Sequence, residues 1–248
     1  MLCLDGFVFA QGGFRLTADW SLEPRSRLAV IGPSGSGKST LLMAIAGFLK
    51  PAAGRILWGD RDLDQLSPAE RPVSILFQDQ NLFPHLTLSQ NLGLAVSPGL
   101  RLEPAQLRGI DAVLDRLGLS GFGNRKPPDL SGGQQGRAAL GRVLLQSKPL
   151  VLLDEPFAAL GPALKADLLE LVAELANEAG QTVVLVTHDP LDALRFADYT
   201  TLVADGVSDA PVPTKALFAA PPQALADYLG PSFFNGRSPD YSGLRLIR

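Results

Sequence analysis

The sequence predicts an α/β protein built on a mostly parallel β-sheet. Three largely apolar segments, at residues 28–31, 150–155 and 182–188, are the basis of this prediction. Strands that are apolar on both faces need cover on both sides, which is typical of parallel sheets flanked by helices. The segments between them contain apolar residues at helical spacing. We therefore expect one main domain over residues 1–230.

The elements around these strands can be predicted in chain order. Short β-like segments at residues 7–9 and 15–17 predict an antiparallel edge that precedes the first core strand. A helix, a turn and two strands are then predicted, in that order, at residues 41–49, 51–54, 55–58 and 73–77. Another helix is expected to begin at Pro162, with Gly180 just past its end.

Residues 84–145 differ in character and predict a helical lobe between the two halves of the sheet. Apolar residues from Leu107 to Leu117 recur at helical spacing, and Gly118 is placed to end that helix. A loop is expected at residues 125–129, before a helix that runs to about residue 146. Residues 231–248 show no clear pattern, and we expect them to form a C-terminal tail.

Composition excludes several classes of protein. The chain has 248 residues, of which 46% are hydrophobic and 19% charged, as in globular proteins. A net charge of −3 argues against a nucleic-acid partner. The single cysteine, Cys3, allows no intrachain disulfide and fits a reducing compartment. With neither a long apolar stretch nor a signal-peptide pattern, the chain is not expected to enter a membrane by itself.

A glycine-rich segment follows the first core strand and precedes the first predicted helix. Its residues fit the pattern G-x-x-x-x-G-K-[ST] and are Gly32, Pro33, Ser34, Gly35, Ser36, Gly37, Lys38, Ser39 and Thr40. The glycines let backbone N–H groups point inward at an anion, and the following helix adds the positive end of its dipole. We expect Lys38 to reach the β- and γ-phosphates and Ser39 to ligate Mg²⁺. The segment predicts a nucleoside triphosphate site, the alternative being a glycine-rich turn with a chance lysine.

Two adjacent carboxylates end the apolar strand at residues 150–155. Asp154 is placed to hold Mg²⁺ at the carboxyl end of that strand, beside the phosphate loop. Glu155 is the next residue, and a partly desolvated Glu can act as a general base. We interpret Glu155 as the group that orients and polarises the attacking water.

A second anion-binding turn is predicted at Ser131-Gly132-Gly133-Gln134. Ser131 and Gln134 are spaced as in a capping box, and two glycines leave the N–H groups of the first helical turn uncovered. An ordinary capped helix is the simpler interpretation. A second bare anion site is useful to a chain with one nucleotide loop if it serves a nucleotide held by a second subunit.

These motifs, together with Gln78 and His188, have the order and spacing of an ABC transporter ATP-binding cassette, and residues 1–230 resemble that family. The resemblance implies two copies packed head to tail with two ATP molecules between them. Each ATP would contact the phosphate loop of one chain and Ser131, Gly133 and Gln134 of the other. It also implies that His188 contacts the γ-phosphate and helps Glu155 hold the water. Gln78 would join Mg²⁺ and water to the helical lobe.

Within the family, residues 71–78 and 81–87 resemble bacterial importers, and residues 90–94 and 98–100 resemble the ATPases of thiamine importers. This resemblance implies an ATP-hydrolysing subunit on the cytoplasmic face of the inner membrane. Its partners would be permease subunits and, indirectly, a periplasmic solute-binding protein. Leu82 and Phe83 either dock a permease helix or staple the first helix of the lobe. The alternatives are an importer cassette for iron, sulfate or polyamine, and a soluble non-transport ABC ATPase.

The chain departs from the family pattern at two positions. The aromatic residue expected to stack on adenine falls near Gln11, so Phe9 or Phe14 must substitute, and we favour Phe9. In Ala158-Ala159-Leu160-Gly161, Gly161 replaces an Asp that the resemblance places opposite the other subunit. Gly161 can still cap the helix that begins at Pro162, at a cost of a few tenths of a kcal/mol relative to Asp. We expect weakened cooperativity between the two sites rather than inactivity.

Replacing Gly161 by the Asp of the family pattern tests the expected loss of cooperativity. Gly161→Asp should raise both the Hill coefficient and the rate of ATP hydrolysis, measured as a function of ATP concentration. Gly161→Ala is the control, because it adds a side chain without a charge. Unchanged kinetics in Gly161→Asp would contradict the expectation.

Overall fold

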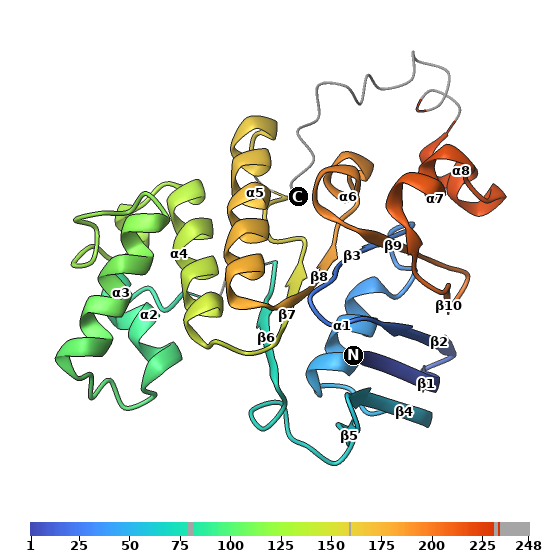
Figure 1. Cartoon of the computed structure of the whole chain (residues 1–248), viewed down its shortest axis with the longest axis horizontal. Coiled ribbons are helices and arrows are strands. Elements are labelled where there is room, and N and C mark those ends of the chain that lie inside the picture. The colour runs from blue at the N-terminus through green and yellow to red at the C-terminus, as the bar shows by residue number, and fades with distance from the viewer. Residues whose placement is uncertain (79–81, 159, 231–232, 234–248) are drawn as a thin grey trace.

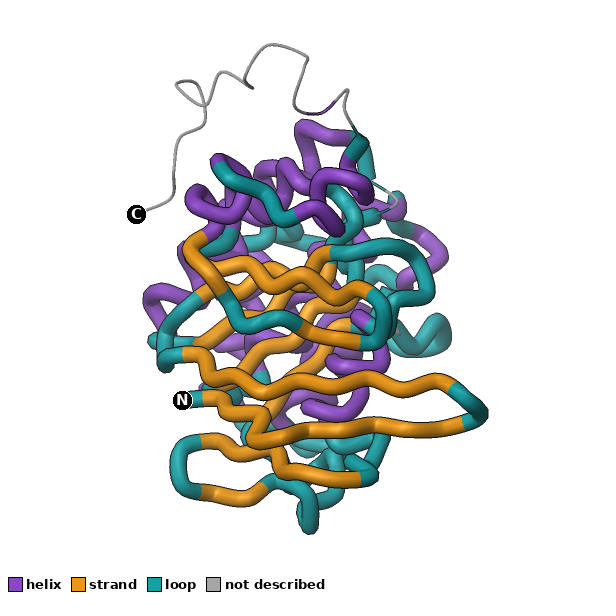
Figure 2. Tube along the Cα trace, turned by 90° about the vertical axis from the view of Figure 1, so that its right-hand side faces the viewer, coloured by secondary structure: helices purple, strands orange, loops and turns teal. Residues whose placement is uncertain are grey.

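A β-sheet forms the core of the molecule, and a group of helices extends beyond it at one end (Figures 1 and 2). The structure is a computed structural model, and it describes every residue except 79–81, 159, 231–232 and 234–248. The described strands are β1 (Leu2–Gln11), β2 (Phe14–Leu22), β3 (Arg27–Ile31), β4 (Ala53–Trp58), β5 (Arg61–Asp62), β6 (Val73–Leu76), β7 (Leu150–Asp154), β8 (Thr182–Val186), β9 (Tyr199–Ala204), β10 (Val207–Ser208) and β11 (Val212–Pro213). Apart from Phe233, the predicted tail lies outside the described residues.

The sheet has a parallel half and a largely antiparallel half. The strand order is β5-β4-β1-β2-β10-β9-β3-β8-β7-β6, and β11 pairs with β9. Strands β9, β3, β8, β7 and β6 are all parallel, whereas β5, β4, β1 and β2 are antiparallel. The predicted parallel core and antiparallel edge are therefore confirmed.

Helices cover the parallel strands on both faces, as continuous apolar strands require. The described helices are α1 (Lys38–Ala46), α2 (Leu88–Val96), α3 (Pro104–Arg116), the 3-10 helix η1 (Pro127–Asp129), α4 (Gly132–Leu145), α5 (Pro162–Ala179), α6 (Pro190–Phe196), α7 (Thr214–Ala219) and α8 (Gln223–Leu229). Along β7, Leu152 joins the apolar cluster around α1, while Val151 and Leu153 join the cluster formed with α4 and α5. Burial on both faces explains why β7 contains no polar residue before Asp154.

The helices between β6 and β7 gather at one end of the molecule, where α5 separates them from α6–α8 (Figure 1). Helices α2, α3 and α4 lie within residues 84–145, as predicted, and share a core with α5, β7 and β8. The domain boundaries at residues 84, 145 and 230 stay predictions. No helix among the described residues has both the length and the apolar character needed to span a bilayer.

Helix α1 begins and ends three residues earlier than the predicted range of 41–49. The expected helix over residues 41–49 ends at Ala46, because Gly47 adopts a left-handed conformation with φ of 92°. Arg71, which is 1% exposed, donates from Nη1 to the carbonyl oxygens of Ala44 and Ile45, both at 2.8 Å. A buried guanidinium thus satisfies the carbonyls at this helix end and fixes the helix that follows the phosphate loop.

Candidate nucleotide-binding site

A cavity of about 570 Å³ opens at the carboxyl ends of β3 and β7. Its lining residues are Phe14, Ser34, Gly35, Gly37, Lys38, Ser39, Thr40, Gln78, Glu155 and His188. Gly32, Pro33 and Ser36 belong to the same loop without lining the cavity, and Asp154 contacts Ser39. Residues far apart in the sequence therefore meet as predicted, and their roles stay proposals.

Glycine is required at two positions of the phosphate loop. Gly37, immediately before α1, has φ of 111°, and a Cβ there would lie 2.8 Å from the ring of Phe14. Gly32 has φ of 148°, and a Cβ there would lie 2.0 Å from the carbonyl oxygen of Val203. Any side chain would push the loop away from β9 or close the cavity.

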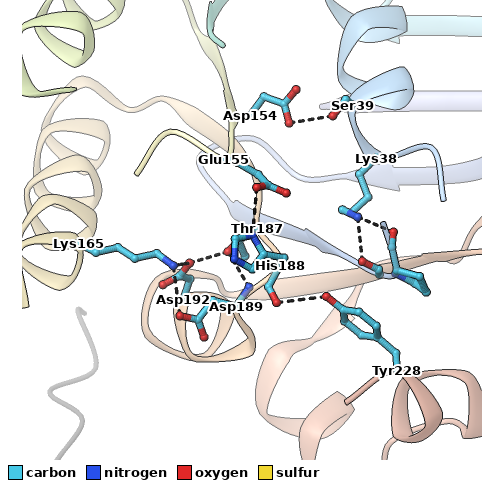
Figure 3. Close-up of polar contacts among 12 residues, drawn as sticks. Lys38, Ser39, Asp154, Glu155, Lys165, Thr187, His188, Asp189, Asp192 and Tyr228 are labelled. Carbon is cyan, nitrogen blue, oxygen red and sulfur yellow. Dashed lines mark hydrogen bonds and ion pairs between the residues drawn. The ribbon is translucent and has the colours of Figure 1, made fainter. Parts of the chain in front are cut away.

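Lys38 is the cation of the site and is only 7% exposed. Its ammonium donates to the carbonyl oxygens of Gly32, at 2.8 Å, and Pro33, at 2.7 Å (Figure 3). Burial lowers the pKa of Lys38, and the negative charges of Glu155 and Asp154 act in the opposite direction. The loop thus holds a buried positive charge beside the cavity.

Ser39 and Asp154 provide oxygen atoms suited to Mg²⁺. The Ser39 hydroxyl donates to Oδ1 of Asp154 at 3.1 Å. Burial raises the pKa of Asp154; the hydrogen bond from Ser39 opposes this rise and the charge of Glu155 adds to it. With Gln78 in the same cavity, the set comprises a hydroxyl, a carboxylate and an amide. Mg²⁺ prefers such oxygen donors and takes few protein ligands when phosphates supply the rest, so these residues fit the ion.

Glu155 and His188 face each other at the cavity. Glu155 has φ of 44°, which is uncommon for a residue other than glycine, and its backbone N–H donates to Val186 at 3.1 Å. Nδ1 of His188 lies 3.0 Å from Oε2 of Glu155 (Figure 3). The imidazole donates this hydrogen bond, since a carboxylate oxygen can only accept. Backbone strain at a carboxylate beside a cavity is typical of functional sites.

The predicted capping box at the start of α4 is confirmed. The Ser131 hydroxyl accepts from the backbone of Gln134 at 3.3 Å, and the Gln134 side chain accepts from the backbone of Ser131 at 3.0 Å. Ser131 and Gly132 are exposed, and neither Ser131, Gly133 nor Gln134 lines the cavity of this chain. The turn is thus an outward-facing helix N-terminus, separate from the phosphate loop.

Phe14, and not the favoured Phe9, lines the cavity. Phe9 is 7% exposed and packs in the apolar cluster around α1, because its side chain points to the buried face of β1. Phe14, at the start of β2, lines the cavity and covers Gly37. Gln11 is exposed. Of the two phenylalanines, Phe14 is therefore the one whose ring is placed at the cavity.

The predicted segments beside the site are partly described. Gly161 begins α5 as its N-cap with no side-chain bond, as expected, whereas Ala159 lies outside the described residues. Leu82 packs against the core of the helical lobe, and Phe83 is 44% exposed. Asn81, the first residue of the segment at 81–87, lies outside the described residues, so the structure describes this segment from Leu82 onward.

Sequence reasoning missed a polar network that surrounds His188. Asp189 caps α6 by accepting from the backbone of Leu191 at 3.0 Å, and the Asp-Pro pair that begins this helix was a usable signal. Lys165 and Asp192 form an ion pair at 2.6 Å. Tyr228 donates to the carbonyl of His188 at 3.2 Å, and no local pattern marks Tyr228 as part of the site.

Comparison with known proteins identifies the family. Residues 17–158, more than half of the chain, match the family described as ABC transporter. The chain belongs to this family. The ABC cassette fold and the activity implied by the motifs are thereby confirmed: the chain is an ATP-binding cassette whose family couples ATP hydrolysis to transport.

Individual relatives extend the ABC likeness to most of the chain. A protein of Cereibacter sphaeroides named thiamine import ATP-binding protein ThiQ is 64% identical over 231 residues, covering 93% of this chain and 100% of that protein. A Yersinia pestis protein of the same name is 44% identical over 217 residues, covering 88% and 92% of the two chains.

Solved ABC cassettes share the fold. The ADP conformation of the cassette MJ1267 has a TM-score of 0.82 at 28% identity, covering 93% of this chain and 98% of that one. A dimeric post-hydrolysis state of the cassette MJ0796 bound to ADP and Pi has a TM-score of 0.75 at 30% identity, covering 86% and 99%.

The position of Phe14 leads to a prediction about nucleotide affinity. Phe14→Ala is expected to raise the KM for ATP about tenfold with little change in kcat, because stacking of a base on an aromatic ring contributes about 1–3 kcal/mol. Steady-state ATPase kinetics measure both constants. Phe9→Leu is the matched control and should leave KM unchanged. An unchanged KM in Phe14→Ala would remove the base-facing role.

Proposed function

We propose that this chain is the ATP-hydrolysing subunit of a bacterial ABC importer that energises thiamine uptake through partner permease subunits. The observation that carries the solute assignment is the 64% identity, over 93% of the chain, to a protein named for thiamine import. The cavity supports the ATPase assignment, since it is lined by the phosphate loop, Glu155 and His188 of one chain.

ATP binding follows from the loop and its lysine. The triphosphate would lie against the backbone N–H groups of the loop, at the N-terminus of α1. The Lys38 ammonium would exchange its contacts with the Gly32 and Pro33 carbonyls for phosphate oxygens. The ring of Phe14 would contact the adenine.

Mg²⁺ would be held by Ser39, Asp154 and Gln78, together with the phosphates. When bound, the ion neutralises charge on the β- and γ-phosphates. The present hydrogen bond from Ser39 to Asp154 holds two of these groups close together.

Hydrolysis would use the carboxylate of Glu155. Glu155 faces the cavity and can accept a hydrogen bond from a water, orient it toward the γ-phosphate and receive its proton. The imidazole of His188, 3.0 Å from Glu155, fixes the carboxylate and would contact the γ-phosphate. Both groups line the cavity that also holds Lys38.

A second copy would complete the site. Ser131, Gly133 and Gln134 form a capped anion-binding turn that faces outward and does not line the cavity of its own chain. A head-to-tail dimer would place this turn against the ATP of the partner, with two ATP molecules enclosed. The solved dimeric cassette bound to ADP and Pi supports this arrangement.

The membrane partner would bind on the side of the helical lobe. Phe83 is 44% exposed, its backbone is held by Asn91 at 2.8 Å, and Leu82 anchors the same segment to the lobe. A rigidly held exposed aromatic residue is suited to a protein interface. The subunit would then lie peripherally on the cytoplasmic face of the membrane.

Removing the proposed general base, Glu155, tests whether two chains form a dimer around ATP. Glu155→Gln is expected to lower ATP hydrolysis by at least about 100-fold, because the amide cannot accept the proton, while ATP binding is kept. Size-exclusion chromatography with Mg-ATP should show a stable dimer. Glu170→Gln, on the exposed face of α5, is the control. A Glu155→Gln protein that stays monomeric with Mg-ATP would argue strongly against the composite site.

The solute is tested in the assembled transporter. The chain is used to pull down its permease, and the complex is reconstituted in lipid vesicles with the solute-binding protein. Thiamine is expected to stimulate ATP hydrolysis several-fold, whereas iron, sulfate and polyamine should not. Stimulation by one of these other solutes instead would overturn the thiamine assignment and leave the importer assignment in place.

A further inference from the structure

His188 lies on a short connection between β8 and α6, and its side chain makes few contacts that would fix its position. Strand β8 ends at Val186 and α6 begins at Pro190, so His188 stands in the three-residue link between them. Its side chain is 57% exposed and touches Glu155. Other contacts must therefore set the position of the imidazole relative to the carboxylate.

On one side, Lys165 of α5 contacts Asp189, one neighbour of His188, directly and reaches the other neighbour, Thr187, through Asp192 (Figure 3). Its ammonium lies 2.6 Å from Asp192 and 3.2 Å from Asp189, and the Lys165 side chain is only 14% exposed. Asp192 in turn accepts a hydrogen bond from the Thr187 hydroxyl at 2.5 Å. The backbone N–H of Asp189 donates to that hydroxyl at 3.1 Å.

This network lies directly beneath the reacting groups. Lys165, Thr187 and Asp192 line the same narrow crevice as Glu155 and His188. Burial raises the pKa of Asp192, and hydrogen bonds from Lys165 and Thr187 oppose the rise. A largely buried ion pair resists rearrangement, because separating its members leaves an uncompensated charge.

On the other side, Tyr228 of α8 reaches the backbone of His188. Its hydroxyl donates to the carbonyl oxygen of His188 at 3.2 Å, and its ring packs against the apolar cluster shared by α6, α7 and α8. Burial raises the pKa of Tyr228, and the charges of Glu155 and Asp189 add to this effect. The hydroxyl therefore keeps its proton and stays a donor at neutral pH.

We propose that Tyr228 and Lys165 are positioning residues that hold His188 against Glu155 from opposite sides. Neither residue touches the nucleotide cavity, and both lie outside residues 17–158, which match the family. Helix α8 is thereby part of the hydrolytic apparatus. This proposal rests on the proposed roles of Glu155 and His188 in ATP hydrolysis.

Tyr228→Phe tests the proposal with the least disturbance, since it keeps the ring and removes only the donor. In the reconstituted transporter, kcat for ATP hydrolysis is expected to fall about three- to tenfold, the loss expected for one hydrogen bond. KM for ATP should stay within about twofold, because the binding loop is unchanged. Tyr199→Phe is the matched control, because its hydroxyl makes no hydrogen bond among the described residues and kcat should not change.

A spectroscopic measurement separates positioning from general stability. The chain contains two histidines, His85 and His188, so imidazole NMR resonances can be assigned with one substitution. Tyr228→Phe should shift the His188 resonance and leave that of His85, which precedes α2, unchanged. Lys165→Met should do the same with a larger loss of kcat, and Lys165→Arg should restore much of it by keeping the charge.

The outcomes distinguish this proposal from the one on which it rests. A wild-type transporter without ATPase activity would contradict the proposed function itself. An active wild type, combined with a Tyr228→Phe protein that keeps the wild-type kcat and His188 resonance, would overturn the positioning role alone. Because Tyr228→Phe is conservative, it decides the question even if Lys165→Met does not fold.

Discussion

The parallel register of β3, β8 and β7 is the constraint on which the site depends. Asp154 pairs with Val186, and Val186 pairs with Val30, so the three strands end at nearly the same level. The residues just past these ends are the phosphate loop, Glu155 and the link that contains His188. Because parallel strands present their carboxyl ends at one edge, three distant segments meet there without long loops. A shift in this register would separate the cation from the carboxylates.

Much of this site could be predicted from the sequence, because its signals are local. The phosphate loop is a strand, a run of glycines and a helix start, all within a few residues, and the structure keeps that order. The capping box at Ser131 and Gln134 is likewise set by a spacing of three residues. The parallel arrangement of these strands could be predicted from their apolar character, since strands buried on both faces are typical of parallel sheets, whereas the order in which β3, β8 and β7 pair comes from the structure.

The features that the sequence did not predict depend on contacts between distant residues, which no local pattern reveals. Phe9 and Phe14 look equivalent in the sequence, but a register shift in β1 and the turn at Gly12 and Gly13 decide which one faces the cavity. Helices α6, α7 and α8 have only seven, six and seven residues, too few for a helical period to stand out. Tyr228 reaches His188 across 40 positions of the sequence, and only the packing of α8 shows it.

The contacts that Lys38 makes within its own loop have a consequence for turnover. The ammonium has two carbonyl partners within its own loop, so a triphosphate that took up the proposed contact with Lys38 would exchange hydrogen bonds instead of adding them. The free energy that Lys38 contributes to triphosphate binding is then the difference between its hydrogen bonds to phosphate and its hydrogen bonds to the two carbonyls. This difference is smaller than the attraction between a cation without partners and a phosphate. In that case the same carbonyls would accept hydrogen bonds from the ammonium again after cleavage, and this exchange would favour release of the product nucleotide. A repeated cycle of binding and release is therefore easier when Lys38 has alternative hydrogen-bond partners within its own loop.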